Sequence, residues 1–144
     1  MTRRLVKLDR SPTAPRRGLI TAELIFVLPI FLALVLATVE FGLLMTASEQ
    51  VQLAAATACR VGTQPSSDLF VLENQVNLAA QAALVSPRLQ TNAAISFTPG
   101  VVPGDQVTVS ISVPMTAASP DLLAFIGFSL NNRFLTATVV MIQQ

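Results

Sequence analysis

The chain has 144 residues, of which 52% are hydrophobic and only 12% are charged, and its mean hydropathy is +0.63. Roughly a quarter of the residues in a soluble globular protein are charged. We therefore expect a chain that meets lipid or a partner protein, with room for a membrane segment and one small domain. It has no histidine and a single cysteine, which excludes a Ser/His or Cys/His nucleophile system and an intramolecular disulfide.

Positive charge is concentrated at the N-terminus, although the net charge is only +1. The basic residues before Leu19 are opposed by Asp9 alone; they are Arg3, Arg4, Lys7, Arg10, Arg16 and Arg17. Basic residues beside an apolar segment stay on the cytoplasmic side of a membrane. We therefore expect residues 1–18 to be a basic cytoplasmic leader, disordered because Pro12 and Pro15 interrupt it, and the C-terminal portion to lie outside. The leader can also serve as a basic patch for anionic lipid.

An apolar run from Leu24 to Ala47 follows the leader. As a helix, its roughly 24 residues would measure about 36 Å, which exceeds the roughly 20 residues needed to cross a bilayer core. The run predicts a single transmembrane helix. It is longer than the apolar region of a cleaved secretory signal, about 7 to 15 residues. Residues 48–60 contain no glycine or proline, so the helical block should extend over residues 19–61, with Cys59 as a small packing residue on it.

Three residues break the uniformity of this segment: Glu23, Pro29 and Glu40. A carboxylate inside a membrane is energetically costly, so each glutamate is a candidate functional residue. Pro29 removes one helical hydrogen bond and favours a kink. Glu40 lies near the far edge of the expected membrane span, where it is either solvated or in contact with a partner helix.

Residues 62–144 are predicted to form a small extracytoplasmic α+β domain. Its first expected element is a helix from Ser67 or Asp68 to about Val85, because apolar residues recur there at intervals of three and four. Residues 93–98 and 106–113 then change to strand patterns around a Pro- and Gly-rich turn, which predicts an antiparallel hairpin with one buried face.

The remaining chain contains one further expected helix and one further strand. Ser119 and Pro120 are typical of a helix start, and the apolar residues 122–130 follow them. Residues 134–142 are rich in β-branched side chains and predict a strand. The expected fold is therefore a three-stranded antiparallel sheet on which the helix ending near Val85 packs, preceded by the long N-terminal helix.

No residue pattern indicates catalysis or ligand binding. The sequence contains no metal-ligand spacing, no Gly-rich phosphate loop and no basic patch with interleaved aromatic residues. The serines and threonines of residues 106–113 fit the solvated face of a sheet. We expect no enzyme activity, no catalytic residues, no cofactor, no metal and no nucleic-acid partner.

The boundary between leader and helix does carry a motif. The sequence Arg16-Arg17-Gly18-Leu19, with Glu23 after it, resembles a type IV prepilin processing site. This resemblance implies that a prepilin peptidase recognises Arg17, Gly18 and Leu19 and cleaves after Gly18. Glu23 would then be the fifth mature residue and would pair with the new N-terminus of a neighbouring subunit. The alternative for Glu23 is a boundary glutamate whose side chain reaches the headgroups.

The residues of the following helix resemble a narrower family within this class. Arg17-Gly18, Ala22-Glu23, Val27-Leu28-Pro29 and Val39-Glu40-Phe41-Gly42 are similar to the N-terminal signature of TadE-like proteins of the tight adherence (Flp) pilus. The resemblance implies a non-catalytic minor pilin or assembly component of the bacterial inner membrane, in which Glu23, Pro29 and Glu40 serve subunit pairing and assembly. Its partners would be the peptidase, other pilins and the pilus assembly platform. The alternatives are an unprocessed membrane-anchored binding domain and a pseudopilin of a type II-like secretion system.

Overall fold

The computed structural model describes residues 17–64 and 68–143. The chain divides into two compact units, Met1–Leu34 and Val35–Gln144, and each is considered by itself below. Residues 1–16 of the expected leader lie outside the described residues. The described residues form a mixed α+β fold with one long N-terminal helix, shorter helices and a three-stranded antiparallel sheet, as the sequence predicts.

Helix α1 spans Arg17–Gly62 and contains Pro29 within it. It ends close to the predicted position, with Arg60 in the last turn, where a cation interacts favourably with the helix dipole. By length and composition, its part from Glu23 to Gly62 is the one segment among the described residues that is able to cross a membrane.

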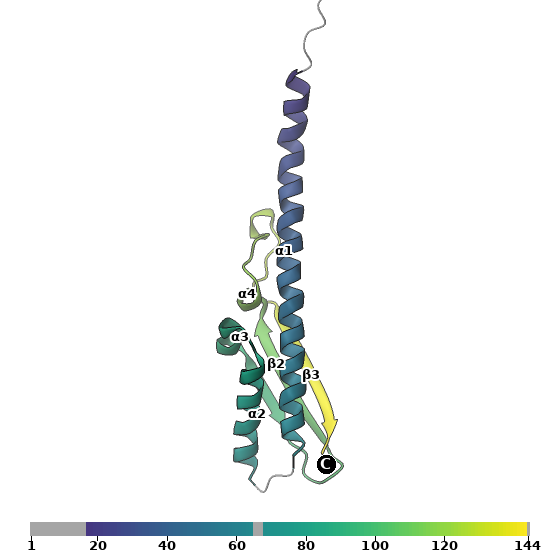
Figure 1. Cartoon of the computed structure of the whole chain (residues 1–144), viewed down its shortest axis with the longest axis vertical. Helices are drawn as coiled ribbons and strands as arrows, with labels where there is room; N and C mark the ends of the chain where they lie inside the picture. The colour runs from purple at the N-terminus through teal and green to yellow at the C-terminus, as the bar shows by residue number, and fades with distance from the viewer. Residues whose placement is uncertain (1–16, 65–67, 144) are drawn as a thin grey trace, which may run out of the picture. The chain divides into compact units, whose positions relative to one another are not determined.

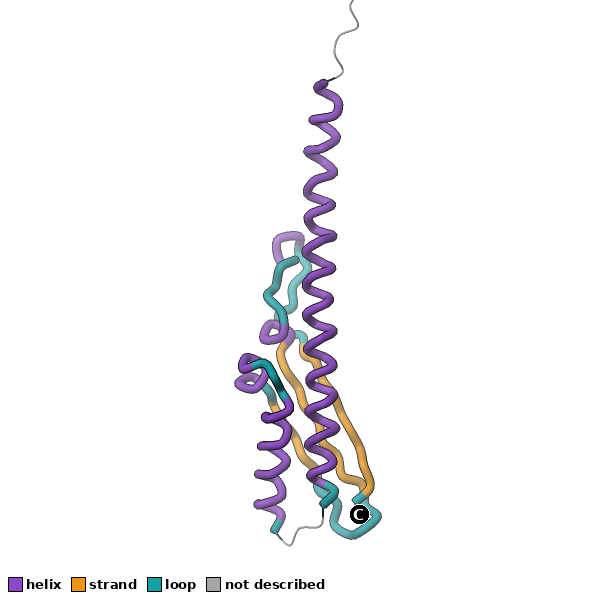
Figure 2. Tube along the Cα trace, viewed as in Figure 1, coloured by secondary structure: helices purple, strands orange, loops and turns teal. Residues whose placement is uncertain are grey.

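The sheet belongs to the second unit and is antiparallel throughout. Its strands are β1 (Ala94–Thr98), β2 (Gln106–Pro114) and β3 (Phe134–Ile142), in the order β1-β2-β3. Figure 2 shows them as the three orange segments. Residues of β2 alternate strictly between buried and half-buried after Gln106, as the period of two in the sequence predicts. Ile111 lies at the centre, opposite Ile95 of β1 and Ala137 of β3.

Two helices, and not one, cover the inner face of this sheet. Helix α2 (Leu69–Ala83) begins with Asp68 as its N-cap, whose side chain accepts a hydrogen bond from the Phe70 backbone N–H at 3.0 Å. It buries Leu72, Val76 and Ala80. The sequence predicts this helix on the sheet but does not reveal that the C-terminal part of α1 joins the same core (Figure 1).

The contribution of α1 to the core consists mostly of small side chains. The buried residues of this face are Ala47, Val51, Ala54, Ala55, Ala58 and Cys59. Small residues let a helix lie close to a sheet, and the prediction of Cys59 as a packing residue is confirmed by its complete burial. The close approach continues to Gly62, where an added Cβ would lie 2.8 Å from the Phe97 ring.

Two local expectations differ from the structure. After the helix expected to end near Val85, the chain forms a further short helix that was not predicted, α3 (Pro87–Asn92), and its Leu89 is buried in the core. The prediction that a helix begins at Ser119 and Pro120 is wrong. Instead, helix α4 (Met115–Ala118) ends there, and the Ser119 N–H donates to the Met115 carbonyl oxygen at 3.0 Å.

Only a short 3-10 helix, η1 (Ala124–Ile126), forms within the apolar segment after Pro120. Gly127 ends it in the left-handed region, at φ 88°, a conformation that glycine adopts without steric cost. The apolar residues of this segment are divided between the protein interior, which takes Leu123 and Leu130, and the surface. Interior contacts therefore override the helix-start pattern.

The outer face of the sheet presents hydroxyl groups. Ser110 lies 3.0 Å from Thr138 and Ser112 lies 3.3 Å from Thr136, measured between side-chain oxygens. These cross-strand pairs are exposed, as expected for a solvated sheet face.

Candidate functional site along helix α1

The predicted processing residues occupy the start of α1. Arg17 is the first residue of the helix, and Gly18 and Leu19 follow within its first turn. The bond expected to be cleaved therefore lies at a helix end. Helix ends fray because their first N–H groups have no partner within the helix.

Glu23 and Pro29 belong to the first unit, and both are exposed in it. The apolar side chains around them are exposed as well. Those from Leu24 to Leu34 with at least half of their surface open are Leu24, Ile25, Phe26, Val27, Leu28, Ile30, Phe31, Leu32 and Leu34. A helix with apolar side chains on every side is stable only within lipid or among other helices. This part of α1 is therefore the surface on which membrane insertion or subunit contact can occur.

Glu40 belongs to the second unit, and the structure gives it a surrounding that the sequence did not indicate. Its side chain is only 2% exposed, and Oε2 accepts a hydrogen bond from the Leu123 backbone N–H at 3.1 Å. Oε1 is also buried and has no hydrogen-bond partner among the described residues. Glu40 thus contacts a distant segment of its own chain. The sequence led us to expect only a solvated glutamate or a contact with a partner helix, and not this contact.

The segment that covers Glu40 is residues 120–133, here called the η1 loop. Asp121 closes it internally, because its Oδ2 accepts hydrogen bonds from Ser129 Oγ at 3.0 Å and from the Leu130 N–H at 3.2 Å. At the base of the loop, the Met115 N–H donates to the Arg133 carbonyl oxygen at 2.9 Å. The loop is therefore held at its base, across its middle and against α1.

Sequence reasoning missed Leu123 as the partner of Glu40. The contact joins residues that are 83 positions apart, and its donor is a backbone N–H. No pattern of side chains in the sequence therefore predicts it. The available signal was a glutamate in an apolar helix together with a second apolar segment, residues 122–130, which Gly127 interrupts.

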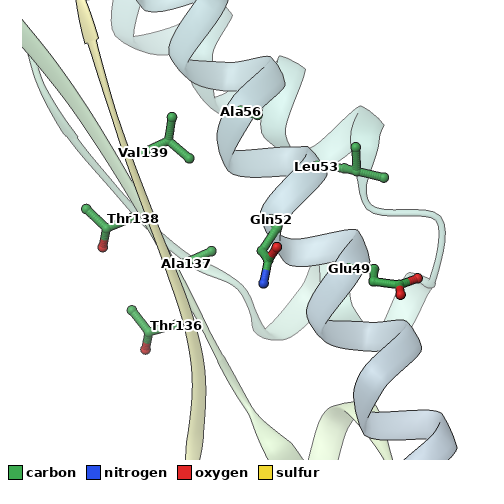
Figure 3. Close-up of a pocket in the computed structure, with 8 residues that line it drawn as sticks. All are labelled: Glu49, Gln52, Leu53, Ala56, Thr136, Ala137, Thr138 and Val139. Carbon is green, nitrogen blue, oxygen red and sulfur yellow. The ribbon is translucent and has the colours of Figure 1, made fainter.

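An open groove of about 750 Å³ runs between α1 and β3. Figure 3 shows the side chains that line it, which come from Glu49, Gln52, Leu53 and Ala56 of α1 and from residues 136–139 of β3. Glu49 is the one titratable group in this lining. The part of the chain that the structure describes also lacks any group of three His, Cys, Asp or Glu side chains placed to hold a metal ion. The groove therefore offers a contact surface formed by α1 and β3.

Comparison with known proteins identifies the region that carries these features. Residues 18–60 match the family model described as TadE-like protein. The matched stretch begins at Gly18 and extends to within two residues of the end of α1. No curated protein and no solved structure matches the chain. The predicted resemblance is confirmed for α1.

Proposed function

From the TadE-like character of residues 18–60, we propose that this protein is a non-catalytic minor pilin or assembly component of a Tad/Flp-type pilus. Helix α1 anchors it in the bacterial inner membrane, with the N-terminus in the cytoplasm and the α+β domain outside. Its partners are a prepilin peptidase, other pilins and the pilus assembly platform.

One observation carries the proposal: within the family-matched stretch, the N-terminal part of α1 exposes large apolar side chains all around the helix. Phe26 is 75% exposed and Ile30 is 70% exposed. Burying such side chains contributes roughly 25 cal/mol for each Å² of apolar surface removed from water. A membrane supplies that burial before assembly, and neighbouring pilin helices supply it afterwards.

We expect the chain to be cut between Gly18 and Leu19 when it is co-expressed with a cognate prepilin peptidase. The mature N-terminus, determined by N-terminal sequencing or mass spectrometry, should then be Leu19. Gly18→Leu should abolish this processing, because the peptidase must accommodate the residue that precedes the scissile bond. The matched control is Gly42→Ala in the same helix, where an added Cβ meets no atom within 4 Å. It should be processed like the wild type.

Two other results would contradict this proposal in different ways. A chain that still begins at Met1, while a known prepilin is cut in the same cells, indicates the unprocessed membrane-anchored binding domain. A chain that begins well after the apolar run indicates a cleaved secretory signal.

Glu23 is proposed to pair with the new N-terminus of a neighbouring subunit. Removing one partner of a buried ion pair costs about 3–5 kcal/mol. We therefore expect Glu23→Ala to leave membrane insertion intact and to reduce incorporation into pili by more than about tenfold. The measurement is the ratio of this subunit in sheared pili to that in membranes. The control is Glu73→Ala on α2, an exposed glutamate of the second unit, and equal incorporation of both variants would refute the pairing role.

A further inference from the structure

The exposed part of the η1 loop is apolar and lies next to α1. Phe125 is 65% exposed, Ile126 is 56% exposed and Phe128 is 45% exposed, while the neighbouring Leu123 is buried against Glu40. Figure 1 shows the loop extending past the ends of the strands alongside α1. Residues 122–128 contain no charged or hydrogen-bonding side chain. Contiguous exposed apolar surface of this kind marks a membrane or protein contact.

The part of α1 beside the loop carries the same character. Within the second unit, Phe41 is 64% exposed, Leu43 is 42% exposed and Met45 is 54% exposed. The helix next to the loop therefore exposes apolar side chains as the loop does. The Glu40 carboxylate is buried where the loop meets this helix, and it accepts a hydrogen bond from the Leu123 N–H. A carboxylate in a membrane is tolerated when it faces protein and has a hydrogen-bond donor, and the loop provides both.

The position of Glu40 in the sequence places it at membrane depth. Glu40 follows Leu24 by about 24 Å of helix, whereas the hydrocarbon core is about 30 Å thick. If the span begins at Leu24, Glu40 lies inside the outer boundary of the core. The loop segment that is hydrogen-bonded to Glu40 must then lie near that boundary as well.

We propose that residues 122–128 of the η1 loop are a membrane-dipping element that enters the outer leaflet beside α1 and shields Glu40 from lipid. Arg133 marks the headgroup side of this element, where a cation meets anionic lipid favourably. Its guanidinium lies over the Phe128 ring, 5.3 Å from the ring centroid, so the charged end and the apolar end of the loop are fixed next to one another.

A lipid surface fits this element better than a second copy of the chain does. A stable protein interface buries about 800 Å² on each partner, which is more than a loop tip of a few residues offers. An interfacial element, by contrast, needs only a small apolar surface that enters about 5–10 Å into the boundary between headgroups and acyl chains.

The test measures the depth of single labelled positions in the full-length chain. Cys59→Ala removes the native thiol, and one cysteine is then introduced by Phe125→Cys, Ile126→Cys, Val101→Cys or Leu32→Cys. Each variant carries an NBD fluorophore and is reconstituted into phosphatidylcholine and phosphatidylglycerol vesicles with or without brominated acyl chains. Val101, 90% exposed in the turn between β1 and β2, is the matched apolar control, and Leu32 reports on the membrane span itself.

Labels at positions 125 and 126 should emit at shorter wavelength than the label at 101 and should lose intensity with brominated lipid. Their depth should be about 5–10 Å below the headgroups. This inference rests on the membrane span of the proposed function. The Leu32 label therefore distinguishes a failure of the dipping element from a failure of the membrane span. Quenching at 32 without quenching at 125 and 126 overturns the dipping element alone, and no quenching at 32 overturns the membrane span.

A second measurement separates lipid from a second copy of the chain. Dilution of the labelled chain with excess lipid should leave the wavelength at positions 125 and 126 unchanged. A return toward the emission of the Val101 label on dilution would show that another protein molecule covers the loop, and would overturn the proposal.

Discussion

Replacing Ile111 by alanine is expected to lower the free energy of unfolding of the second unit by about 2–5 kcal/mol, the range for truncating a large core residue. Ile111 is fully buried in the central strand. It belongs to the cluster in which the sheet meets α1 and α2, so the cavity would open where all three elements meet. Urea unfolding of the full-length chain in detergent micelles, followed by far-ultraviolet circular dichroism, measures the change. Tryptophan fluorescence is excluded because the chain has no tryptophan.

Thr108→Ala is the matched control for this prediction. Thr108 lies in the same strand on the opposite face and is half-buried. Substitutions on such a face usually change stability by about 0.5 kcal/mol or less. Equal destabilisation by both variants would contradict the assignment of the inner and outer faces of the sheet.

Glu40→Leu is expected to release the η1 loop from α1. The substitution removes the acceptor of the Leu123 N–H, and a buried donor left without a partner costs about 1–3 kcal/mol. Limited proteolysis with trypsin, in micelles, should therefore cleave after Arg133 roughly 5- to 100-fold faster, provided that cleavage follows local opening. Cleavage after Arg88, in α3, should keep its wild-type rate.

Glu40→Gln tests whether hydrogen bonding or charge is responsible. The amide oxygen of glutamine can accept the Leu123 N–H in the same way, so this variant should retain most of the protection at Arg133. If Glu40→Gln is cleaved as fast as Glu40→Leu, the negative charge of Glu40 holds the loop and the hydrogen bond is secondary.

Patterns of short range were sufficient to predict most of the fold. Three patterns depend only on neighbours within one element: the apolar run from Leu24 to Ala47, the alternation in residues 106–113 and the β-branched residues 134–142. The helix and the strands that form there agree with the predictions. The turn residues between β1 and β2 likewise predicted the hairpin. Such patterns predict helices and strands because burial of one face imposes a period on the sequence.

Patterns failed where a distant contact decided the outcome. Ser119 and Pro120 have the residue types of a helix start, yet Ser119 is buried and its N–H completes the end of α4. Leu123 and Leu130 are buried, whereas residues 124–128 between them are exposed. Helix propensities differ by less than about 1 kcal/mol per residue, whereas burying one leucine side chain contributes about 1.5–3 kcal/mol. Burial of the two leucines therefore overrides the local preference for a helix.

The sequence by itself determined the apolar α1, the sheet, the absence of histidine-based chemistry and the motif at Gly18, Leu19 and Glu23. Each of these depends on composition or on residues close together in the chain. Only the tertiary structure decided that α1 shares the core of the sheet, and that Glu40 is bound by the backbone of Leu123. Both are contacts between segments far apart in the sequence, one made by small apolar side chains and the other by a main-chain N–H. Small apolar side chains and a main-chain N–H occur throughout the chain, so the sequence does not indicate which partner each of them contacts.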